Sequence, residues 1–133
     1  MPAHSRYNLL KRAGIALVVE DEAPIRLAIA KSLHKRAFDV PEAADGTAAL
    51  KLIREHKDTI VLLLLDITLP GAPSREVLAE ARGVRPDIKV IVTSAYGQNQ
   101  VDASFPGMKI DSFIRNPFQL GNLLSQIRTV LSE

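Results

Sequence analysis

The sequence of 133 residues contains no cysteine, which excludes disulfide bonds and thiolate metal sites. It also lacks any apolar run close to the roughly 20 residues that a helix needs to cross a bilayer. Residues 1–14 carry basic side chains late in the segment and no long apolar core, so we expect no secretory signal. These absences predict a cytoplasmic protein with no membrane partner.

The sequence has little excess of charge of either sign, with a net charge of +2 at pH 7. The excess comes from Arg6, Lys11 and Arg12, because residues 15–133 hold 14 basic and 15 acidic side chains. A nucleic-acid interface needs a dense basic face, and none is visible, so we predict no nucleic-acid partner. We interpret residues 1–13 as a basic leader or linker and residues 14–133 as a single domain.

Short apolar runs alternate with segments of helical periodicity along the chain, without internal repeats. The predicted strands are residues 15–20, 38–40, 60–65, 89–93 and 110–115. The segment 97–106 is a poor helix, whereas the last helix has a clear apolar stripe from Leu120 to Leu131. This alternation predicts an α/β fold, in which helices cover both faces of one parallel sheet.

Acidic side chains follow two of the predicted strands. The apolar run 60–65 ends in Asp66, and Glu20 and Asp21 end the first strand. A lone Asp66 would be interpreted most simply as a cap of the following turn. Parallel strands, however, bring their carboxyl ends together where the winding direction of the sheet switches. Two carboxylates at about 4 Å repel by roughly 4 kcal/mol at an effective dielectric constant near 20, and a divalent cation removes that cost.

The candidate ligands are all oxygen atoms, which favours Mg²⁺ or Mn²⁺ over zinc. A carboxylate beside such an ion can attack a phosphoryl group and form an aspartyl phosphate. Asp66 is the candidate nucleophile, and a hydroxyl group of Thr93 or Ser94 could hydrogen-bond to the new phosphate.

Four motifs occur in order: VVEDE, LLLLDITLPG, VIVTSA and FIRNPF. In combination they make residues 14–132 resemble the receiver domain of the two-component response-regulator family. The resemblance implies a flavodoxin-like receiver fold, with a doubly wound five-stranded sheet in the order 2-1-3-4-5. It also implies Mg²⁺ as cofactor and a sensor histidine kinase or phosphotransfer protein as the phosphoryl source.

The resemblance assigns Asp66 as the phospho-acceptor. It makes Asp21 a direct metal ligand, Glu20 a ligand through water, and the backbone carbonyl of Thr68 a further ligand. The remaining assignments concern switching. Ser94 matches the switch hydroxyl, with Thr93 as the alternative one residue away. Phe113 matches the switch aromatic, although it could equally be an ordinary core side chain.

The sequence departs from the receiver pattern at Asn116, where receivers carry a lysine before Pro-Phe. Arg115 should point to the opposite face of its strand and so cannot easily replace that lysine. We therefore expect weaker coupling between phosphorylation and conformational change, with metal binding retained. We also expect a cis bond before Pro117.

A second departure lies after the acceptor, where receivers often read Pro-Gly-x-Asp-Gly. The sequence here is Pro-Gly-Ala-Pro-Ser over residues 70–74, so Pro73 or Ser74 should open the next helix without the usual glycine.

Two other functions compete with a phospho-accepting receiver. A degenerate receiver could act only as a protein-interaction module, through the face of residues 97–133, with a partner protein or with a second copy of the chain. A phosphatase of the haloacid dehalogenase type also uses a strand-end aspartate with Mg²⁺, but it needs a second aspartate two residues later, where this chain has Thr68. We therefore predict that the protein is not an enzyme.

Overall fold

The computed structural model describes residues 14–132, so the predicted leader 1–13 lies outside the described part. The strands are β1 (Gly14–Val19), β2 (Phe38–Asp39), β3 (Glu42–Ala43), β4 (Ile60–Asp66), β5 (Lys89–Ser94) and β6 (Ser112–Arg115). The helices are α2 (Ala23–His34), α3 (Gly46–Glu55), α4 (Ser74–Val84), α5 (Gln98–Ser104) and α6 (Leu120–Leu131). No helix within residues 14–132 is both long and apolar enough to cross a membrane.

All pairs of neighbouring strands are parallel, in the order β2-β1-β4-β5-β6, and β3 also pairs with β1. The predicted order is therefore correct, but the second strand is divided into β2 and β3. Pro41 lies between these two pieces and has no N–H to donate to a ladder. Its carbonyl still accepts a hydrogen bond from the Val18 N–H at 3.1 Å, so the interrupted strand stays beside β1.

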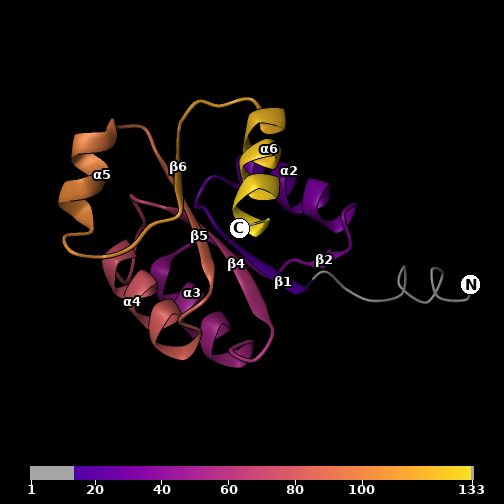
Figure 1. Cartoon of the computed structure of the whole chain (residues 1–133), viewed down its shortest axis with the longest axis horizontal. Helices are drawn as coiled ribbons and strands as arrows, with labels where there is room; N and C mark the ends of the chain where they lie inside the picture. Colours follow the sequence, from indigo (N-terminus) through magenta and orange to yellow (C-terminus); the bar gives the residue numbers. More distant parts are fainter. Residues whose placement is uncertain (1–13, 133) are drawn as a thin grey trace, which may run out of the picture.

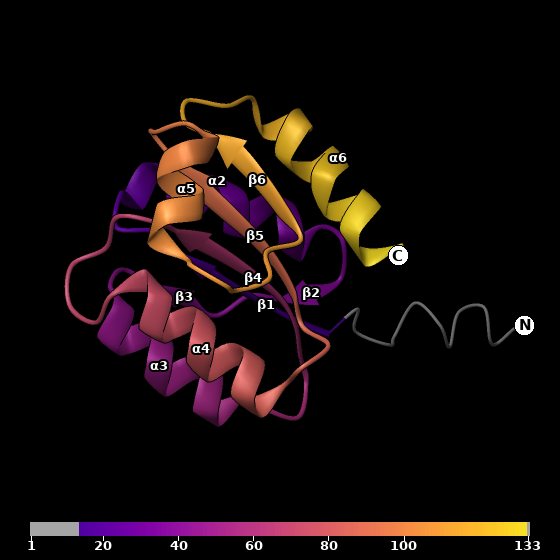
Figure 2. The ribbon, with the colours of Figure 1, turned by 60° about the vertical axis from the view of Figure 1, so that its left-hand side comes forward.

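Helices cover both faces of the sheet (Figures 1 and 2). Helices α3, α4 and α5 share one apolar core with the sheet, and α2 and α6 share the other. Successive side chains of β4 enter alternate cores: Leu63 and Leu65 face α3 and α4, while Leu62 and Leu64 face α2 and α6. Because both faces are buried, β4 is apolar throughout until it reaches Asp66.

The loop after β4 is held against the start of α3. The Gly46 N–H donates to the Pro70 carbonyl at 3.0 Å, and the Ala72 N–H donates to the Thr47 hydroxyl oxygen at 3.3 Å. A Cβ atom on Gly46 would lie 1.8 Å from the Ala72 carbonyl oxygen, so only glycine allows this approach. Gly71 turns the same loop with a φ of +78°, a conformation that favours glycine.

A buried ion pair between Arg82 and Asp111 also stabilises the fold. The Asp111 carboxylate, whose side chain is 3% exposed, lies 3.1 Å from a guanidinium nitrogen of Arg82. It also accepts the Val90 N–H at 2.8 Å. Burial raises the pKa of Asp111, but the Val90 N–H and Arg82 outweigh it, so the pKa is lowered. This pair ties α4 to the segment that enters β6.

Candidate functional site

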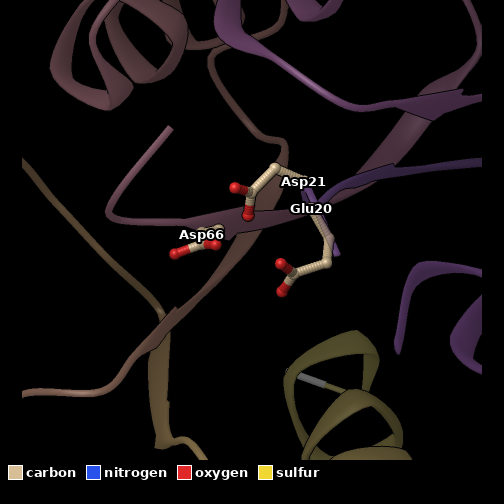
Figure 3. A group of neighbouring side chains, drawn as sticks. All are labelled: Glu20, Asp21 and Asp66. Carbon is tan, nitrogen blue, oxygen red and sulfur yellow. The ribbon is translucent and has the colours of Figure 1, made fainter. Parts of the chain in front are cut away.

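Three carboxylates meet at the carboxyl ends of β1 and β4 (Figure 3). Oxygen atoms of Glu20, Asp21 and Asp66 all lie within 4.8 Å of one another. Glu20 is 4% exposed and Asp66 is 6% exposed, whereas Asp21 is open to solvent. The structure thus brings together the three acidic residues that the sequence predicted as one cluster.

The pKa of Glu20 shows that ionised carboxylates are unfavourable in this cluster. The pKa of Glu20 is raised to about 8; burial is the largest cause, and the charge of Asp66 contributes to the rise. The Glu22 N–H, which donates to the Glu20 carboxylate at 3.1 Å, opposes the rise. In the metal-free chain Glu20 therefore tends to keep its proton at neutral pH.

Asp66 occupies the end of β4, and burial raises its pKa also. The backbone N–H and the hydroxyl group of Thr68 both donate to the same carboxylate oxygen, at 3.0 Å and 3.2 Å. These two bonds lower the pKa and partly oppose burial. Both bonds go to one oxygen atom, so they fix the orientation of the carboxylate group.

A cavity of about 370 Å³ opens beside the carboxylates. It is lined by Asp21, Glu22, Ile25, Asp66, Thr68, Ala95, Asn116 and Pro117. Asn116, the residue that replaces the receiver lysine, therefore lies at the site and not on a distant surface. The bond between Asn116 and Pro117 is cis, as predicted.

The residues assigned to switching lie at the ends of β5 and β6. Thr93 is opposite Asp66 in the ladder, and its neighbour Ser94 is fully buried. The Ser94 hydroxyl oxygen accepts the Tyr96 N–H at 2.9 Å. Phe113 is half-buried and packs against the core formed with α3, α4 and α5. The choice between Thr93 and Ser94, and the role of Phe113, stay predictions.

Arg115 lies opposite Ser94 in the ladder between β5 and β6, whereas Asn116 lines the cavity with Asp66. The Arg115 side chain is exposed and donates to the Ala95 carbonyl at 3.4 Å. Ala95 also lines that cavity, so this contact does not test the expected opposite directions of Arg115 and Asn116, which stay a prediction.

The donor set fits a hard divalent cation. Glu20, Asp21 and Asp66 offer only carboxylate oxygens, which Mg²⁺ and Mn²⁺ prefer. Burial is the main cause of the raised pKa values of Glu20 and Asp66, so ionising both carboxylates in this pocket is costly unless a cation is bound. Within residues 14–132, the lining of this cavity includes Asp21, Glu22 and Asp66 but no lysine or arginine that would stabilise their charge.

Two residues make contacts at the site that were not predicted from the sequence. Arg26 of α2 donates to the Glu20 carbonyl at 2.9 Å and pairs with Glu42 at 3.2 Å, which fixes the end of β1. The Ser74 hydroxyl reaches the carbonyls of Asp66 and Ile67, at 2.6 Å and 2.9 Å. The Pro-Ser sequence at the start of α4 is visible, but its spacing does not reveal where the hydroxyl points.

The fold and site define a receiver-type protein, and comparison with known proteins agrees. The profile of the response regulator receiver domain matches residues 16–128. The chain therefore belongs to the response regulator receiver domain family.

Individual relatives are similar over most of the chain. It is 34% identical to the chemotaxis protein CheY of Bacillus subtilis over 119 residues, which cover 87% of this chain and 96% of that protein. It is 29% identical to the sensor kinase CckA of Brucella abortus over 124 residues, 93% of this chain but only 13% of the kinase. Receiver domains thus occur both as nearly whole proteins and as small parts of larger ones among the relatives.

Solved structures support the same fold. The receiver domain of the hybrid histidine kinase CckA is 31% identical, with a TM-score of 0.73 over 89% of this chain and 99% of that chain. A CheY-like receiver domain protein from Methanospirillum hungatei is 26% identical, with a TM-score of 0.78 over 90% of this chain and 94% of that chain.

Proposed function

We propose that this chain is a phospho-accepting receiver that transmits a two-component signal, with Asp66 as the acceptor. The observation that carries the proposal is the Asp66 carboxylate, which lies beside Glu20 and Asp21 and is oriented by two hydrogen bonds from Thr68. The proposed phosphoryl source is a sensor histidine kinase or a phosphotransfer protein, and the proposed location is cytoplasmic. The protein acts as an acceptor and not as an enzyme that turns over a separate substrate.

The transfer needs an ionised Asp66. A carboxylate oxygen forms the new P–O bond while the P–N bond of a phosphohistidine breaks, and the bonding electron pair leaves with the imidazole nitrogen, which takes up a proton. Bound Mg²⁺ would neutralise charge on the phosphoryl oxygens during this step. Glu20 and Asp21 would hold the ion, together with Asp66 and the Thr68 carbonyl. The Thr68 N–H fixes the acceptor for attack.

Intact mass tests this proposal. The chain is incubated with acetyl phosphate or a sensor kinase, once with Mg²⁺ and once with a chelator. We expect a gain of one phosphoryl group that depends on Mg²⁺. If neither donor transfers a group while circular dichroism shows an intact fold, the proposal is wrong.

Asn116 favours a second candidate, a receiver that binds its partners without phosphorylation. A lysine ammonium group bonded to a phosphoryl oxygen is worth roughly 1.5–3 kcal/mol, against about 1 kcal/mol for a neutral amide. The proposed contact surface is the face of residues 97–133, for a downstream partner or a second copy. Partner binding that is equal in the parent and in Asp66→Asn would support this candidate.

Restoring the lysine is expected to strengthen the site for a phosphoryl group. In the presence of Mg²⁺, we expect Asn116→Lys to bind beryllium fluoride, a phosphoryl analogue, about tenfold more tightly, because a charge-assisted bond replaces a neutral one. Calorimetry measures the affinity. Asn122→Lys, on an exposed position of α6, adds the same charge away from the cavity and serves as the control. Equal affinities for all three chains would contradict the role given to Asn116.

A further inference from the structure

Ser74 is a buried hydroxyl residue beside the acceptor that the receiver pattern does not explain. It is the first residue of α4 and stands where receivers often have glycine. The residue is 5% exposed. A glycine there would supply no side-chain hydrogen-bond donor.

The Ser74 hydroxyl contacts two consecutive backbone carbonyls. Its oxygen lies 2.6 Å from the Asp66 carbonyl oxygen and 2.9 Å from the Ile67 carbonyl oxygen. Because both partners can only accept, the hydroxyl is the donor, and its one proton is shared between them. These two carbonyls belong to the peptide units that connect Asp66 to Thr68.

Helix capping does not account for this hydroxyl. Serine at the start of a helix commonly accepts a backbone N–H of the first turn. In α4 the N-cap position is held by Pro73, and no side chain caps the helix. The hydroxyl of Ser74 is instead directed back at the acceptor strand.

The two carbonyls lie where regular sheet bonding ends. The last bond from the acceptor segment to β5 runs from the Ile67 N–H to the Thr93 carbonyl, at 3.0 Å. Beyond it, the peptide unit between Ile67 and Thr68 is held by Ser74 on its carbonyl side and by Asp66 on its N–H side. The orientation of this peptide unit affects the orientation of the Asp66 carboxylate, which accepts its N–H, and the direction in which the backbone continues at Thr68.

We propose that Ser74 is a positioning residue for phosphoryl transfer, which holds the Asp66–Thr68 backbone in the geometry that the acceptor and its metal require. This inference rests on the proposed function. Ser74 would act only on the orientation of the acceptor, since its hydroxyl bonds to backbone carbonyls and not to the Asp66 carboxylate. A small displacement of a reacting group is enough to slow a reaction markedly.

The test compares Ser74→Ala and Ser74→Gly, which lack the hydroxyl, with Ser74→Thr, which keeps it. Thr129→Ala is the control, because Thr129 bonds to the Ser125 carbonyl on the exposed side of α6, at 3.1 Å. Acetyl phosphate is the donor, and calorimetry with MgCl₂ alone gives the Mg²⁺ affinity. Circular dichroism confirms folding and gives the melting temperature of each variant.

We expect Ser74→Ala and Ser74→Gly to lower the phosphorylation rate constant at saturating donor about 5- to 10-fold, at an unchanged half-saturating concentration. Their Mg²⁺ affinity should fall about tenfold, as for residues that orient a metal ligand. Ser74→Thr should restore the rate to within about twofold of the parent, since the hydroxyl is retained. Thr129→Ala should behave like the parent.

The proposal is overturned if the alanine and glycine variants lose only melting temperature and keep the parental rate and Mg²⁺ affinity. It is also overturned if Ser74→Thr is as slow as Ser74→Ala, because packing would then set the rate. If the parent itself accepts no phosphoryl group, the proposed function fails separately. The Mg²⁺ titration then decides on Ser74: weaker binding without the hydroxyl supports the positioning role, and equal binding refutes it.

Discussion

Asp66→Asn is expected to accept no phosphoryl group under conditions in which the parent chain is fully modified. An asparagine amide cannot form the aspartyl phosphate, because its oxygen is a weak nucleophile and its nitrogen is not basic. The amide oxygen can still accept the Thr68 N–H and hydroxyl bonds that the carboxylate accepts at 3.0 Å and 3.2 Å. The local fold should therefore survive, so the loss reports chemistry and not unfolding.

Asp58→Asn is the matched control for this loss. Asp58 is exposed and lies just before β4, at the opposite end of the strand that carries Asp66. Intact mass should show that Asp58→Asn is modified at the parental rate. Modification of Asp66→Asn by one phosphoryl group would place the acceptor elsewhere and would contradict the assignment.

Glu20→Gln is expected to raise the stability of the metal-free protein by about 3 kcal/mol at pH 7, or roughly 10–15 °C in melting temperature. The folded state raises the Glu20 pKa from 4.5 to about 8, because the side chain is buried beside Asp66. An unfolded chain releases this proton near pH 4.5, whereas the folded chain keeps it until about pH 8. The folded state is therefore penalised progressively as the pH rises through that interval, and a neutral glutamine removes the penalty.

Melting curves in a chelator between pH 4 and pH 9 measure this effect. The difference in stability between Glu20→Gln and the parent should be small near pH 4 and should grow up to about pH 8. Glu55→Gln is the control, since Glu55 is exposed at the end of α3. Added Mg²⁺ should stabilise the parent more than Glu20→Gln, because one metal-holding carboxylate is lost. A constant difference across the pH range would show that Glu20 does not titrate as described.

The architecture could be predicted from the sequence because burial leaves a strong pattern. A strand covered on both faces must be apolar throughout, which made residues 60–65 recognisable as the centre of a parallel sheet. The division into β2 and β3 could not be predicted with the same method. The sequence predicts one strand at residues 38–40, but the ladder is interrupted and then resumes after Pro41, because tertiary pairing with β1 overrides the local sequence signal.

The acidic cluster could be predicted because its residues end parallel strands, and topology brings such ends together. Ser74 could not, because its contact depends on the path of the loop after β4. The sequence indicates that Pro73 or Ser74 opens α4, and α4 does begin at Ser74. Only the backbone course shows that the hydroxyl turns toward Asp66 and away from the helix it opens.

The close approach of Gly46 to Ala72 has a consequence for the evolution of this chain. Every amino acid that one nucleotide change can substitute for glycine carries a Cβ atom, which at this position would lie 1.8 Å from the Ala72 carbonyl oxygen. Drift through this codon is therefore blocked unless the loop moves first. In a random mutagenesis library selected for signalling, position 46 should remain glycine, although this residue is neither a ligand nor a nucleophile. The reason is that the acceptor loop leaves no room for a Cβ atom there.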